Sequence, residues 1–130
     1  MVTAKKHLGQ HFLNDETYCQ RIVDAFNPQR DPVHALEIGP GAGAITGLLF
    51  QREDLHLFAI DIDTESIAHL KSEFPDQANQ MIETDFLKMD IDPYLKNGQV
   101  GIIGNFPYNI SSQILFKVYE ERSKVNEVVG

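Results

Sequence analysis

Short apolar runs alternate with longer amphipathic stretches along the 130 residues of the chain. The amphipathic stretches carry apolar residues three and four positions apart, which is typical of helices, whereas the apolar runs have the length of buried strands. The pattern predicts helices over residues 15–26, 44–50, 64–74 and 111–119, and strands over residues 34–38, 55–60, 80–83, 100–104 and 125–129.

Polar and helix-breaking residues stand where these predicted helices begin and end. Asn14 or Asp15 can cap the first helix, and Ser111 or Ser112 can cap the last. Pro75 is expected to end the third helix, because a proline disfavours helical backbone in the residue before it.

The regular alternation of strands and helices implies parallel strands joined by right-handed crossovers, which is a doubly wound, mainly parallel α/β sheet. No repeat or linker divides the chain, so residues 1–130 are expected to form one domain. Parallel strands normally need both faces covered. A chain ending directly after its fifth strand is therefore expected to be truncated, with an exposed strand that favours self-association.

Composition narrows the class of protein without identifying it. A formal net charge of −8 argues against a large nucleic-acid surface on this chain. No apolar run is long enough to cross a bilayer, and the basic N-terminus lacks the features of a signal peptide, so a cytoplasmic location is expected. Cys19 is the only cysteine, and His7 and His11 have no evident third ligand, so no metal site is predicted.

Four segments that could bind a ligand follow predicted strands: 39–43, 61–63, 84–85 and 105–108. In doubly wound sheets, ligands bind outside the carboxyl ends of the strands. The glycine loop at 39–43 leaves room for a close approach to backbone amides, and Asp61, about twenty residues on, can accept hydrogen bonds from ribose hydroxyls. This pair indicates an adenosine-containing cofactor; the structural alternative is a helix-capping turn with a solvated acid.

Two further acids lie beside these segments. Asp85 can accept a hydrogen bond from an adenine amino group, or it can simply occupy a surface turn. Glu37 lies just before the glycine loop and can either support that loop or reach the amino group of a cofactor. Structural support is the favoured interpretation for Glu37.

The tetrapeptide Asn105-Phe106-Pro107-Tyr108 carries the most specific chemistry. An exocyclic adenine amine is a poor nucleophile, because its lone pair is delocalised into the ring. The Asn105 side-chain oxygen and the Phe106 carbonyl can accept hydrogen bonds from its two N–H groups, while Pro107 biases Phe106 toward an extended conformation. Tyr108 offers a flat face for a stacked base. The alternative is an ordinary Asn-x-Pro turn with Tyr108 as a packing residue.

Four segments occur in an order that is typical of one family. Residues 6–15, 37–41, 59–63 and 104–111 read KHLGQHFLND, EIGPG, AIDID and GNFPYNIS. Together they resemble the small-subunit (16S) ribosomal RNA adenine N6-dimethyltransferases, and the resemblance runs from Lys5 to the last residue. It implies a Rossmann-like class I methyltransferase domain that binds S-adenosylmethionine, followed in the family by a C-terminal helical domain that this chain lacks.

The family dimethylates two adjacent adenines of small-subunit ribosomal RNA, so the resemblance implies a pre-30S particle as partner and a monomeric parent protein. It places the adenine at Asn105, Phe106, Pro107 and Tyr108. It places cofactor contacts at His11, Leu13, Gly39, Gly41, Asp61, Asp85 and Asn105.

Three residues depart from the family pattern, which usually has Asn where this chain has His11, Glu at Asp61 and Leu at Phe106. At His11 and Phe106 the backbone can still make the expected contacts. Asp61 keeps a carboxylate with a shorter reach. The departures therefore bear on cofactor affinity rather than on the class of reaction.

Three alternative functions remain open from the sequence. A large-subunit ribosomal RNA methyltransferase would share these motifs, and so would a nucleic-acid-binding relative without catalytic activity. A nicotinamide-dependent dehydrogenase would share the glycine loop and the acid, but it leaves the tetrapeptide unexplained.

Overall fold

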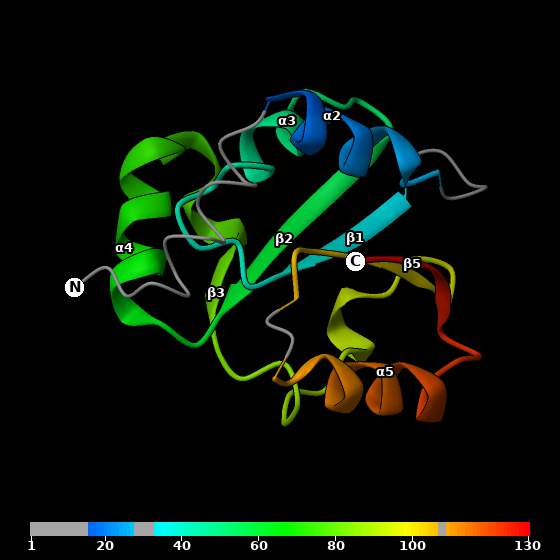
Figure 1. The fold of residues 1–130 in the computed structure, drawn as a ribbon. Helices are drawn as coiled ribbons and strands as arrows, with labels where there is room; N and C mark the ends of the chain where they lie inside the picture. The colour runs from blue at the N-terminus through cyan, green and yellow to red at the C-terminus, as the bar shows by residue number, and fades with distance from the viewer. Residues whose placement is uncertain (1–15, 28–32, 107–108) are drawn as a thin grey trace.

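A computed structural model describes residues 16–27, 33–106 and 109–130. Its helices and strands alternate as the sequence predicts, with two additional short 3-10 turns (Figure 1). In chain order the elements are α2 Glu16–Ala25, β1 Val33–Ile38, α3 Thr46–Phe50, β2 Leu55–Asp61, α4 Thr64–Glu73, η1 Pro75–Gln80, β3 Met81–Glu83, η2 Asp92–Tyr94, β4 Val100–Ile103, α5 Ser111–Glu120 and β5 Val125–Val129.

The five strands form one sheet in the order β3-β2-β1-β4-β5. Each neighbouring pair is parallel. The first strand, β1, therefore lies in the centre of the sheet, and the later strands are added on both sides of it. This is the predicted doubly wound α/β fold, and it brings the carboxyl ends of β1, β2 and β3 to one edge.

Helices cover both faces of the sheet, with α2 and α3 above it and α5 below it in Figure 1. The α2/α3 face buries Val23 and Leu49 against Ala35 and Leu57. The α5 face buries Leu36, Ile60 and Ile102 together with Ile114 of α5. Successive strand residues point to opposite faces, so strands with apolar residues at nearly every position, such as β4, are buried on both sides.

Two helix starts differ in detail from the sequence prediction. The second helix begins at Thr46 rather than at residue 44, because residues 41–45 form turns. The prediction that Ser111 or Ser112 caps α5 is wrong: Ile110 stands at the N-cap position without a side-chain cap. The Ile110 side chain packs against the α5 face of the core, so burial determines how the chain enters this helix.

The amino ends of the strands are closed by packed side chains. Arg52, just before β2, donates from Nη1 to the carbonyls of Val23 at 2.8 Å and Phe26 at 2.5 Å, and from Nε to Asp54 at 2.9 Å. The Arg52 guanidinium holds the pKa of the Asp54 carboxyl below its usual value. On the other face of the sheet the ring of Phe58 lies 5.0 Å from that of Tyr94, centroid to centroid. This end therefore has a structural role.

No helix among the described residues is both long enough and apolar enough to cross a lipid bilayer.

Candidate active site

The glycine loop follows β1 and bends sharply away from the sheet. Gly39 and Gly41 have φ values of 68° and 57°, a conformation that side-chain-bearing residues rarely adopt. Gly39 N donates to the Ile60 carbonyl at 2.8 Å, which holds the loop against β2. Apart from the adjoining residues, no atom of the described part of the chain lies within 4 Å of the position that a Cβ would take at either glycine.

Asp61 lies at the end of β2 and is joined to this loop. Its Oδ2 accepts a hydrogen bond from Gly41 N at 3.3 Å, and its Oδ1 accepts one from Asp63 N at 2.9 Å. The two residues that the sequence paired across about twenty positions are thus in direct contact. The bonds from these two amides fix the orientation of the carboxylate.

Asp85 lies in the turn after β3. Its Oδ1 accepts a hydrogen bond from Leu87 N at 3.0 Å, and its carbonyl accepts from the amides of Lys88 and Met89, each at 3.0 Å. The turn is held to the neighbouring strand because Thr84 N donates to the Asp61 carbonyl at 3.0 Å. Asp85 therefore stabilises a surface turn, and that turn lies at the edge of the candidate site. The two interpretations of Asp85 are compatible.

Gly39, Asp61 and Asp85 line one cavity of about 110 Å³ at the carboxyl edge of the sheet. The sequence did not single out the apolar residues that complete it, because their role depends on which segments meet in space. Those residues come from the strand ends, the turn after β3 and the start of α5: Ile38, Ile60, Ile62, Phe86, Leu87, Ile110 and Ile114. A cavity with apolar walls and a few polar groups is typical of a site for a small organic ligand.

Asn105 and Phe106 follow β4 and are both half-buried. Gly104 brings this segment close to β1: a Cβ at Gly104 would lie 2.5 Å from the carbonyl oxygen of Ile38, a residue that also lines the cavity. The Phe106 ring packs into the core on the α5 face and lies against Gly104 and Gly130. The predicted site residues His11, Leu13, Pro107 and Tyr108 lie outside the described residues.

Glu37 is fully buried under the glycine loop, and Thr46 Oγ1 donates to its Oε1 at 2.6 Å. Burial raises the pKa of this carboxyl to about 8, a shift that the Thr46 hydrogen bond opposes and the nearby Asp61 charge reinforces. A carboxyl so placed is neutral over most of the physiological range. Its contact with α3 agrees with the supporting role that the sequence favoured.

The hydrogen-bond acceptors at this edge fit an adenosine-containing cofactor. Asp61 and Asp85 present carboxylates at the ends of neighbouring strands, and the glycine loop leaves space where a Cβ would otherwise stand. Apolar side chains on both sides of the cavity can hold a flat base. Among the described residues, no three His, Cys, Asp or Glu side chains gather as metal ligands.

Comparison with known proteins agrees with this interpretation. Residues 1–129 match the family model described as ribosomal RNA adenine dimethylase. The ribosomal RNA small subunit methyltransferase A of Cytophaga hutchinsonii is 49% identical over 129 residues, which make up 99% of this chain and 50% of that protein. The chain spans about half the length of the curated relatives that it matches.

Two solved structures share the fold. The crystal structure of the 23S rRNA methyltransferase ErmE superposes with a TM-score of 0.71 at 25% identity, covering 88% of this chain and 44% of that one. A dimethyladenosine transferase from Plasmodium falciparum gives a TM-score of 0.66 at 28% identity, covering 88% of this chain and 40% of that one. The fold and its carboxyl edge thus define a Rossmann-like methyltransferase domain. Within that class, the chain belongs to the ribosomal RNA adenine dimethylase family.

Proposed function

We propose that residues 1–130 form an incomplete cofactor-binding domain of a cytoplasmic enzyme that transfers methyl groups from S-adenosylmethionine to the N6 amines of two adjacent adenines in small-subunit ribosomal RNA. The observation that carries the proposal is the cavity that Gly39, Asp61 and Asp85 share beside the segment beginning at Asn105. Each of these residues was selected from the sequence for a separate part of this chemistry.

In this proposal the chain's own residues bind and orient the cofactor. Asp61 accepts hydrogen bonds from the ribose hydroxyls, Asp85 accepts one from the adenine amine, and the glycine loop allows a close approach to the backbone. His11 and Leu13 add contacts from the N-terminal segment. The bound S-adenosylmethionine supplies an electrophilic methyl group.

The tetrapeptide acts on the target base. The Asn105 oxygen and the Phe106 carbonyl accept hydrogen bonds from the two N–H groups of the amine and draw its nitrogen toward tetrahedral geometry. With S-adenosylmethionine bound, the nitrogen lone pair would form a bond to the methyl carbon as the methyl–sulfur bond breaks. S-adenosylhomocysteine would leave, and the nitrogen would lose a proton. Stacking on Tyr108 contributes about 1–3 kcal/mol to holding the extruded base, and Pro107 fixes the backbone between them.

The relatives support the small subunit as target. The protein that is 49% identical over nearly the whole chain carries the small-subunit name, whereas the large-subunit enzyme ErmE is 25% identical. ErmE still superposes well, so methylation of large-subunit RNA is the second candidate function. A negative chain does not by itself hold a polyanion, so the proposed enzyme needs a basic surface outside this domain.

A transfer assay tests the proposal. The full-length protein is incubated with S-adenosylmethionine carrying a labelled methyl group and with either pre-30S particles lacking the modification or free large-subunit RNA. We expect label on adenine N6 in the first substrate. Label only in the second would favour the large-subunit alternative, and no transfer to either RNA would favour a non-catalytic binding protein.

Calorimetry tests the remaining alternative, a nicotinamide-dependent dehydrogenase. S-adenosylhomocysteine should bind and NAD should not, because a dehydrogenase has no use for the Asn105 tetrapeptide.

Residues 1–130 alone are expected to methylate ribosomal particles poorly and to self-associate through β5 at the sheet edge, whereas the parent protein is expected to be a monomer. Sedimentation of both forms tests that expectation.

A further inference from the structure

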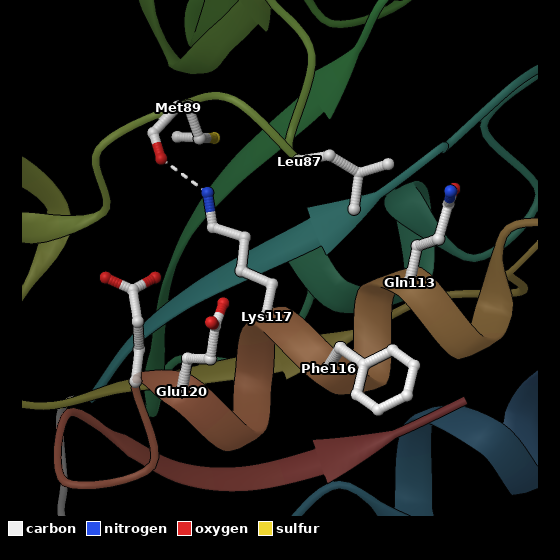
Figure 2. Close-up of a pocket in the computed structure, with 7 residues that line it drawn as sticks. Leu87, Met89, Gln113, Phe116, Lys117 and Glu120 are labelled. Atoms are coloured by element: carbon white, nitrogen blue, oxygen red, sulfur yellow. Dashed lines mark hydrogen bonds between the residues drawn. The ribbon is translucent and has the colours of Figure 1, made fainter.

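A lysine of α5 fastens the turn that carries Asp85. Lys117 Nζ donates to the Phe86 carbonyl at 2.5 Å and also to the Met89 carbonyl, and it lies 4.9 Å from the centre of the Phe86 ring. Figure 2 shows the side chain crossing from α5 to Met89, with Leu87 on the same side of the helix. One ammonium group thus holds both ends of the segment 86–89.

The fastened turn is also a wall of the candidate cofactor site. Phe86 is only 5% exposed, and together with Asp85 and Leu87 it lines the cavity that contains Gly39 and Asp61. The Asp85 carboxylate accepts from Leu87 N inside the same turn. A shift of the turn would therefore move the carboxylate that the proposed function assigns to the adenine amine.

The helix that carries Lys117 forms the facing wall. Ile110 and Ile114 line the same cavity, and Lys117 stands one turn beyond Ile114 on the same face of α5. The chain enters this helix directly from the segment that begins at Asn105. Lys117 thus joins the turn at one side of the cavity to the helix that follows the proposed catalytic loop.

We infer that Lys117 is a positioning residue, which sets the orientation of Asp85 beside the cofactor cavity by tying the 86–89 turn to α5. It lines a neighbouring surface hollow of about 500 Å³, which shares Leu87 with the cofactor cavity, and it does not line that cavity itself, so it acts through the turn. The inference rests on the proposed function, since it assumes that Asp85 contacts the cofactor. Precise placement of such groups matters, because a displacement of about 1 Å can lower the rate of a catalysed reaction up to a hundred-fold.

The test compares dissociation constants of S-adenosylhomocysteine by calorimetry for the full-length protein and its variants. Lys117→Met keeps most of the side-chain length and removes the donors, and it should weaken binding about ten-fold, within the range of coupling between residues in contact. Lys117→Arg can still donate to both carbonyls and should stay within about three-fold of wild type. Lys88→Met is the matched control, because Lys88 belongs to the same turn and is exposed.

A double-mutant cycle with Asp85→Ala distinguishes positioning from general destabilisation. If Lys117 acts through Asp85, adding Lys117→Met to Asp85→Ala should weaken binding by less than about two-fold. An equal loss in both backgrounds, or a Lys117→Met protein that binds like wild type, overturns the inference. Should Lys117→Met fail to fold, the same cycle with Lys117→Gln applies. A folded wild-type protein that binds no S-adenosylhomocysteine would instead refute the proposed function.

Discussion

The two ends of the same sheet are built in opposite ways. At the amino ends, Arg52 is bonded to two carbonyls of the α2 segment and to Asp54, and aromatic rings pack on one another at His34, His56 and Phe58. At the carboxyl ends, left-handed glycines form a turn whose Cβ positions no described atom fills, and the carboxyl-bearing residues Asp61 and Asp85 line a cavity. The sheet has two distinct ends because its strands are parallel, which places all their carboxyl ends together.

The difference shows where this domain can accommodate a ligand. Arg52 donates its side-chain hydrogen bonds to groups within the protein, whereas the carboxylates of Asp61 and Asp85 shape turns beside the cavity that both residues line. Substitutions at the carboxyl edge should therefore change binding or turnover, and substitutions at the amino edge should change stability alone.

The largest effect is expected at the carboxyl edge for Asn105→Ala in the full-length enzyme. The Asn105 oxygen matters most as the amine becomes tetrahedral, so its contribution grows between the ground state and the transition state. By analogy with the loss of one oxyanion-hole donor, turnover should fall roughly 10²–10³-fold, while RNA affinity stays nearly unchanged because phosphate contacts dominate it.

Single-turnover kinetics at saturating cofactor and RNA measure this, with the affinity for S-adenosylmethionine determined alongside. Wild-type turnover in the variant would mean that the tetrapeptide is a structural turn, and the carboxyl edge would then lose its catalytic assignment.

Asp61→Ala should have the next largest effect on binding or turnover. Losing charge-assisted hydrogen bonds to ribose hydroxyls typically costs about 1.5–3 kcal/mol, which is about ten- to a hundred-fold in cofactor affinity. Titration calorimetry with S-adenosylhomocysteine checks the change. Exposed Asp76→Ala, in the turn after α4, is the control and should bind like wild type. Equal affinity of Asp61→Ala and wild type would contradict the ribose assignment.

Glu37 should make stability depend on pH. Its folded-state pKa of about 8 lies above the ordinary value of 4.5, so its contribution is complete below pH 4.5 and is lost as pH rises toward 8. Between those values the wild-type free energy of unfolding should fall by up to about 1.4 kcal/mol per pH unit from this group.

Glu37→Gln mimics the neutral carboxyl and keeps an oxygen for Thr46, so it should remove most of that slope. Urea unfolding at several pH values provides the comparison, with exposed Glu73→Gln as the control. Parallel pH profiles for wild type and Glu37→Gln would contradict a raised pKa of the Glu37 carboxyl in the folded state.

The smallest effect is expected at the amino edge for Arg52→Met. The variant loses bonds to the Val23 and Phe26 carbonyls, which should lower the free energy of unfolding by about 1–2 kcal/mol at this partly exposed site. Cofactor affinity should not change. Arg122→Met, which removes an exposed guanidinium stacked on Tyr119, is the control. A loss of cofactor affinity in Arg52→Met would break the division between the two edges.

The sequence predicted most of this fold because the chain's local patterns agree with its tertiary structure. All five strands lie where the apolar runs predicted them, and Pro75 ends α4 as expected. The error at the start of α5 has a tertiary cause: polar Ser111 is the better cap by propensity, but Ile110 takes the position because its side chain packs in the core. The η1 and η2 turns were missed, since short 3-10 segments lack a clear periodicity.

The candidate site was predictable to the extent that topology fixes it. Asp61 and Gly41 could be paired in advance, because neighbouring parallel strands end side by side. The contact of Lys117 with the turn after Asp85 could not, since it joins residues 31 positions apart across a helix and an irregular segment. The roles assigned to the site residues all stay predictions, and four of those residues lie outside the described part of the chain: His11, Leu13, Pro107 and Tyr108.

Gly104 shows how backbone spacing can be mistaken for chemistry in a functional screen. It has no reactive group, but a side chain there would collide with the Ile38 carbonyl and displace the segment that begins with Asn105. In a saturation-mutagenesis survey scored by methyl transfer to RNA, substitutions at Gly104 would therefore resemble substitutions at Asn105. Only purified proteins, compared for cofactor affinity as well as turnover, would separate a residue that reacts from one that merely leaves room.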